Sequence, residues 1–63
     1  MDSAAVVRAL RKAGWELDRV RGSHHIFRHP NKPGTVVVAH PRKDVPIGTL
    51  RQIERQSELR LRS

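Results

Sequence analysis

The sequence predicts an α+β fold in which a three-stranded antiparallel sheet carries two helices on one face, in the order αβββα. Apolar residues recur at helical spacing near both ends of the chain, and alternating or β-branched runs lie between them. The links between those runs are too short for crossover connections, which favours a meander of antiparallel strands. With 63 residues, the chain is expected to form one small domain over 1–63 with a thin core.

The first helix is expected over residues 4–13. Ser3 suits the N-cap position, and Asp2 beside it favours the positive end of the helix dipole. Gly14 lies where a left-handed C-terminal cap belongs. The apolar side of this helix consists of Val6, Val7, Leu10 and Ala13.

Three strands are expected to follow, over residues 15–21, 24–29 and 35–40. The first two alternate in character, and the third is rich in β-branched residues. The dipeptide Gly22-Ser23 provides the first turn, and the Pro- and Gly-rich segment 30–34 provides the second.

A rigid basic loop over 41–46 leads to a second helix that begins around Pro46, since proline is favoured at a first helical position. The arginine-rich end, residues 59–63, is expected to fray. The inward face of this helix is predicted to consist of Ile47, Leu50, Ile53 and, at its end, Ser57.

Alternation along the middle strand places His24, Ile26 and Arg28 on the face opposite to Phe27. Phe27 is the largest apolar residue of the run, so we expect it to point at the helices and His24 to lie on the open face of the sheet. A bulge near Gly22 would reset this phase. An inward Ile26 would place His24 at the inner rim instead.

The charge balance is strongly basic, with 13 Lys and Arg against 6 Asp and Glu, a net charge of +7. A charge this large on so short a chain favours a polyanionic partner, nucleic acid first and an acidic protein second. The alternative is a solvated basic surface without a specific partner.

Several classes of protein are excluded by what the sequence lacks. Without cysteine the chain forms neither disulfides nor thiolate metal sites. Its longest apolar run, residues 36–39, is far shorter than the roughly 20 residues of a membrane span, and the start does not resemble a signal peptide. A cytoplasmic protein without metal or cofactor is therefore expected. His25 and His29 do not suggest a metal site, because on a strand they lie roughly 13 Å apart.

General acid–base chemistry suits the histidines better than metal binding. A metal-free ribonuclease needs a group that exchanges protons near neutral pH and fixed positive charge around the phosphate. Ser23, in the tight turn before His24, is predicted to orient the scissile group, and Arg21 and Arg28 are near enough in sequence to hold a phosphate. The alternative for His24 is a surface or hydrogen-bonded histidine without a catalytic role.

A second basic element, Arg42-Lys43, precedes the start of the second helix. Unpaired N–H groups at a helix N-terminus attract phosphate, Gly48 permits close approach of an anion, and Thr49 adds a hydroxyl. The alternative is a proline-started helix after a solvated basic loop.

Five segments of the chain, taken in their order and spacing, resemble the HicA toxin family. These are the small messenger-RNA interferases of HicAB toxin–antitoxin modules, also called YcfA-like proteins. Gly-Ser-His alone is a weak signal, but it is specific when joined to the later Pro-x-Gly-Thr. The segments are Gly14-Trp15, Gly22-Ser23-His24-His25-Ile26-Phe27, Pro30-Asn31-Lys32-Pro33-Gly34, His40-Pro41 and Pro46-Ile47-Gly48-Thr49-Leu50-Arg51-Gln52-Ile53.

The resemblance implies a double-stranded-RNA-binding-like αβββα fold and a stress-response toxin that cleaves mRNA without a metal and arrests translation. It also implies neutralisation by a HicB-type antitoxin. His24 matches the catalytic histidine of the family's Gly-Ser-His motif. The first turn of the second helix, Ile47-Gly48-Thr49, lacks the lysine cluster of ordinary duplex-binding domains, so single-stranded or locally unpaired mRNA is the expected substrate.

Two other functions remain open from the sequence. A non-catalytic module that binds RNA and blocks translation by occupancy fits the charge equally well. A subunit whose basic face docks an acidic protein partner also fits, and it overlaps with the toxin hypothesis.

Overall fold

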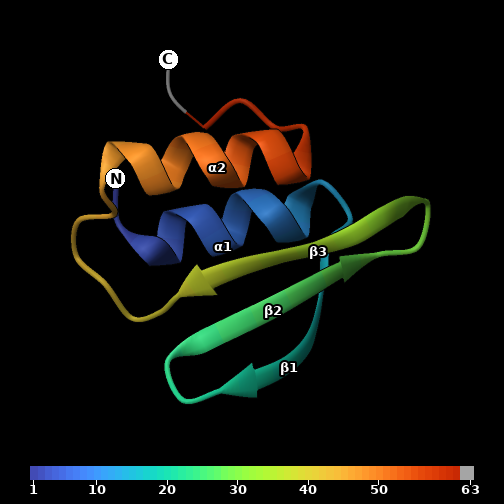
Figure 1. The fold of residues 1–63 in the computed structure, drawn as a ribbon, viewed down its shortest axis with the longest axis horizontal. Coiled ribbons are helices and arrows are strands. Elements are labelled where there is room, and N and C mark those ends of the chain that lie inside the picture. Colours follow the sequence, from blue (N-terminus) through green and yellow to red (C-terminus); the bar gives the residue numbers. More distant parts are fainter. Residues whose placement is uncertain (62–63) are drawn as a thin grey trace.

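The computed structural model describes residues 1–61 and has the predicted αβββα order (Figure 1). The strands form one sheet in the order β1-β2-β3, and both neighbouring pairs are antiparallel. The predicted α+β meander is therefore confirmed. The elements are α1 (Ser3–Lys12), β1 (Glu16–Arg21), β2 (His24–His29), β3 (Lys32–Ala39) and α2 (Ile47–Ser57).

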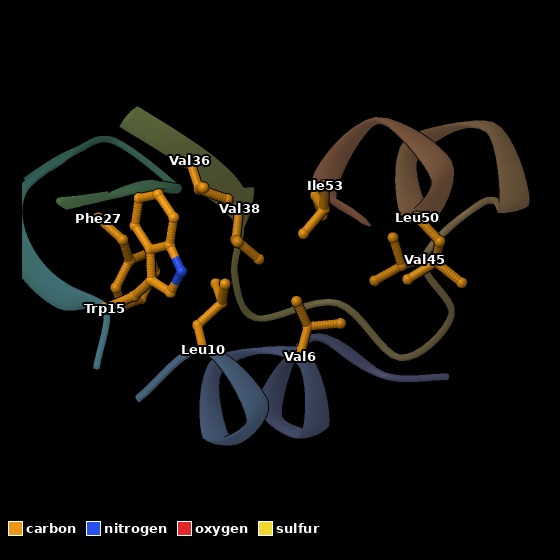
Figure 2. Packing of buried hydrophobic residues seen from close by; sticks show 9 residues of the cluster. All are labelled: Val6, Leu10, Trp15, Phe27, Val36, Val38, Val45, Leu50 and Ile53. Carbon is orange, nitrogen blue, oxygen red and sulfur yellow. The ribbon is translucent and has the colours of Figure 1, made fainter. Parts of the chain in front are cut away.

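Both helices pack against the β3 side of the sheet, and β1 lies on the far side (Figure 1). Phe27 is fully buried and belongs to the core, together with apolar residues of β3 and of both helices. All six residues of β1 are exposed, because no helix covers that strand. Figure 2 shows the core side chains Val6, Leu10, Trp15, Phe27, Val36, Val38, Val45, Leu50 and Ile53.

The start of α1 differs from the sequence prediction, in which Ser3 is the N-cap. Asp2 is the N-cap, and its carboxylate accepts a hydrogen bond from the N–H of Ala5 at 2.9 Å. Ser3 is buried instead, and its Oγ accepts a hydrogen bond from the N–H of Arg42 at 2.7 Å and lies 2.6 Å from Nδ1 of His40. The prediction fails because this long-range contact fixes the serine, whereas capping preferences consider only neighbours in sequence.

The start of α2 also differs from the prediction. Ile47 was expected on the inward face of this helix, but it is 59% exposed. Val45, in the loop before the helix, is buried in its place, and its N–H donates to the carbonyl of Met1 at 2.9 Å. Leu50, Ile53 and Ser57 are buried as predicted.

The segment after α2 packs onto the domain as far as the structure describes it. Leu59 and Leu61 are partly buried against the core, and the N–H of Leu61 donates to the carboxylate of Glu54 at 2.8 Å. The predicted fraying covers residues 59–63, and of these, residues 62–63 lie outside the described residues.

Candidate functional site

His24 is the first residue of β2 and is exposed on the face of the sheet opposite to the helices, as predicted. Phe27 points to the helices, which sets the phase of the strand. Residues paired across antiparallel strands share a face. The pairings define an open face that consists of Glu16, Arg19, Arg21, His24, Ile26, Arg28, Thr35, Val37 and Ala39.

A tight hairpin places Arg21 directly opposite His24. Gly22 supplies the positive φ, 61°, that a two-residue hairpin turn with glycine first requires. Arg21 and His24 are register partners, so their Cβ atoms lie about 5 Å apart. Arg21 makes no ion pair with the residues that the structure describes. A free guanidinium therefore stands beside the exposed imidazole.

A second arginine, Arg19, lies on the same face as Arg21, next to a β-bulge at Asp18. The register of β1 shifts between Leu17 and Arg19, and Arg19 is paired with Ile26. With Arg21 held opposite His24 by the hairpin, a regular strand would also place Arg19 opposite Ile26, but it would place Asp18 opposite Phe27 and Leu17 opposite Arg28. The bulge instead pairs Leu17 with Phe27 and Glu16 with Arg28, so it keeps Asp18 out of the position opposite Phe27. Arg19 was absent from the predicted site, although its spacing of two residues from Arg21 places it on the same face of the strand.

A groove lies between His24 and α2, because α2 packs along the edge strand β3. We call it the α2 groove; its lining residues are His24, Val37, Thr49, Gln52, Ile53 and Gln56. Thr49 was predicted as a site residue, and the structure places it with His24. The two glutamines were not predicted, because nothing in the local sequence shows that this side of the helix faces the open face.

Other predicted site residues lie farther from His24. Arg28 shares the open face but lies four residues along β2, roughly 13 Å away. Arg42 and Lys43 line a different hollow at the start of α1. Gly48 is exposed on the first turn of α2 and is not among the residues that line the groove.

Ser23, the remaining predicted residue, uses its backbone rather than its hydroxyl. Its carbonyl accepts a hydrogen bond from the N–H of His40 at 2.8 Å, which ties the hairpin to the end of β3. Its hydroxyl makes no hydrogen bond with the described part of the chain, and so remains open to a ligand next to His24.

The other three histidines face away from the open face and have structural contacts. The rings of His25 and His40 form a T-shaped pair with centroids 5.0 Å apart. His29 packs edge-on against Trp15 at 5.2 Å. Within residues 1–61, no group of three or more His, Asp or Glu side chains could hold a metal ion.

The arrangement joins two functions that phosphodiester chemistry requires. An exposed imidazole exchanges protons with a bound group, and the neighbouring guanidinium stabilises a phosphate on which negative charge develops. The first turn of α2 has no side-chain cap, so its N–H groups are also open to an anion close to Thr49. His24 and Arg21 form the centre of this candidate site.

Comparisons with known proteins identify the family of this chain. None of its helices, over the described residues, is long and apolar enough to cross a membrane, and no curated protein matches it by sequence. The fold is similar to a solved chain described as "HicA3 and HicB3 toxin-antitoxin complex", with a TM-score of 0.86 and 29% sequence identity over 98% of this chain and 100% of that one. The family model described as HicA toxin of bacterial toxin-antitoxin matches residues 3–59. The chain therefore belongs to the HicA toxin family.

Proposed function

We propose that this HicA-family chain is a metal-independent endoribonuclease that cleaves mRNA and arrests translation in the cytoplasm. The observation that carries the proposal is the position of His24, which is exposed on the open face, paired with Arg21, and at one side of the α2 groove. A histidine with only a structural role is expected to have ring contacts like those of His25, His29 and His40, and His24 has no such contact among the described residues.

In the proposed reaction the 2′-oxygen of a ribose attacks the adjacent phosphorus, and the bond from phosphorus to the 5′-oxygen breaks. The attacking hydroxyl loses a proton and the leaving oxygen gains one, and His24 carries one of these two transfers. Arg21 stabilises the negative charge that develops on the phosphate oxygens. The products are a 2′,3′-cyclic phosphate and a 5′-hydroxyl. Because the ribose hydroxyl is the nucleophile and side chains move the protons, the proposed reaction uses no metal ion.

The proposed substrate is single-stranded or locally unpaired mRNA. The first turn of α2 carries Ile47, Gly48 and Thr49, none of which is basic. Domains that bind duplex RNA contact phosphates across its grooves and recognise its shape. A free strand, by contrast, can place its backbone on the arginines of the open face and turn a base away from it.

We also propose that a HicB-type antitoxin neutralises the chain by covering the open face. The similar solved structure is of a HicA3 and HicB3 complex, and the net charge of +7 suits an acidic partner surface. A partner that covers His24 and Arg21 blocks RNA from the site. Cleavage that continues undiminished with the antitoxin at saturation would contradict this masking.

The decisive experiment is RNA cleavage by purified protein in EDTA, followed by mapping of new 5′ ends. We expect the wild type to cut and His24→Ala to lose a factor of about 10²–10⁴ in rate while it still binds RNA. His25→Ala is the matched control, because it removes the neighbouring imidazole from the other face and is expected to keep cleavage. Normal cutting by His24→Ala overturns the assignment, and intact bound RNA with the wild type indicates a translation block by occupancy.

A further inference from the structure

The α2 groove contains hydrogen-bonding side chains that are not needed for proton transfer by His24. Thr49, Gln52 and Gln56 follow one another at spacings of three and four residues, so they lie on one side of α2. None of these three side chains makes a hydrogen bond or ion pair with the residues that the structure describes. Both glutamines are exposed, and their amide donors and acceptors are therefore available to a ligand.

The groove also has an apolar component. Val37 lies on the open face, is 40% exposed, and lines the groove together with the buried Ile53. An apolar surface flanked by neutral donors and acceptors suits a flat ligand that is apolar on its faces and polar along its edge. A nucleobase has these properties, and unstacked bases of single-stranded RNA are recognised in this manner.

The distribution of charge favours a base over a protein segment as occupant. No arginine, lysine or carboxylate lines the α2 groove, whereas Arg19 and Arg21 lie on the open face beside it. Nucleic acid separates its charge in the same way, with anionic phosphates on the backbone and neutral edges on the bases. An acidic segment of a protein partner would instead need cations within the groove.

We infer that the α2 groove binds the base of a nucleotide next to the scissile phosphate and that Gln52 and Gln56 read the edge of that base. This inference rests on the proposed function, since it takes RNA as the substrate. The amide of glutamine both donates and accepts, so it forms paired hydrogen bonds with a base edge of matching pattern and leaves a mismatched edge unsatisfied. The two glutamines then determine the base preference of the toxin, while His24 and Arg21 act on the phosphate.

The test measures the binding of short 2′-fluoro oligonucleotides, which lack the 2′-hydroxyl nucleophile and so remain intact with the active protein. The oligonucleotides differ at a single position. The wild type is expected to separate the best from the worst base by about tenfold in Kd. The double variant Gln52→Ala/Gln56→Ala should bind all four bases within about twofold, with an unchanged salt dependence because no charge is removed.

The matched control is Asn31→Ala, which removes an amide from the exposed turn between β2 and β3 without a change in charge. It is expected to keep the full discrimination. The inference is overturned if the double variant keeps the wild-type discrimination, or if the wild type binds all four bases equally. Either result would indicate that the two glutamines contact a protein partner instead. Failure to bind any of the oligonucleotides contradicts the proposed function itself, and the base-reading groove with it.

Discussion

The imidazole of His29 occupies the space in which a side chain at Gly14 would lie. A Cβ atom on Gly14 would stand 2.9 Å from Nε2 of His29. The N–H of Asn31 donates to Nδ1 of that ring at 3.0 Å, so Nε2 carries the proton and donates to the carbonyl of Ala13 at 3.1 Å. Nε2 thus joins the end of β2 to the end of α1, and Nδ1 holds the ring against the turn that follows β2, which makes His29 a structural histidine.

Gly14→Ala is expected to lower the free energy of unfolding by about 1–3 kcal/mol, because Gly14 has a φ of 95° and the added methyl group meets His29. Urea unfolding measures the loss. Gly48→Ala is the control. Gly48 lies in α2 without a positive φ, and the space around it is open, so this substitution should raise the free energy of unfolding by about 0.5–1 kcal/mol. Equal effects of the two substitutions would contradict this role of Gly14.

Ser3→Ala is expected to lower the free energy of unfolding by about 1–3 kcal/mol, since it leaves the N–H of Arg42 and Nδ1 of His40 without their hydrogen-bond partner. Ser23→Ala removes a hydroxyl that makes no hydrogen bond in the described chain and should change stability by less than about 0.5 kcal/mol. Thermal or urea unfolding of both variants makes the comparison. An unaffected Ser3→Ala variant would show that this contact does not hold the loop to α1.

Arg21→Ala is expected to weaken RNA binding and to reduce the slope of log Kd against log salt concentration by about 0.7, the share of one phosphate contact on a single strand. Arg8 is an exposed arginine of α1, away from the open face, and Arg8→Ala should leave that slope close to its wild-type value. Titrations at several salt concentrations decide between them. A slope that falls equally in both variants would mean that the RNA follows no particular face.

Two single-residue deletions test the bulge in β1. Removal of Asp18 deletes the unpaired residue together with its ion pair to Arg19 and keeps Arg19 opposite Ile26, so we expect RNA binding at least as tight as that of the wild type and a stability within about 0.5 kcal/mol of it. Removal of Arg19 makes the strand regular and places Asp18 opposite Ile26, which puts a carboxylate near the phosphate path. That variant should bind RNA more weakly. Binding that is equal for both deletions would remove Arg19 from the proposed RNA surface.

A substrate with a single 2′-deoxynucleotide on the 5′ side of the scissile bond is expected to resist cleavage, because it lacks the attacking oxygen. Cutting elsewhere in the same oligonucleotide provides the internal control. The measurement is a sequencing gel of end-labelled products. Cleavage at the deoxy position would show that water, and not the neighbouring ribose, attacks the phosphorus.

Much of the fold and the central residue of the site follow from local patterns. The run His24–His29 contains two adjacent buried apolar residues, and Phe27, the larger, belongs to the core cluster whereas Ile26 does not, which fixes the phase of β2 and so places His24 on the opposite face. The turn at Gly22 pairs Arg21 with His24 with no need of distant contacts. Predictions that relied on propensity at the ends of elements, such as Ser3 and Ile47, were wrong because distant residues decide burial there.

The amino-acid order alone determined the five elements, their antiparallel meander, the basic character and the face of His24, since each depends on spacing along a few neighbouring residues. Tertiary structure alone decided that Leu17 pairs with Phe27 across the bulge at Asp18, because a bulge arises only when two strands pair. It also decided that Gln52 and Gln56 stand beside His24. Their position depends on how α2 packs along β3, and that packing is set by contacts between residues far apart in the chain.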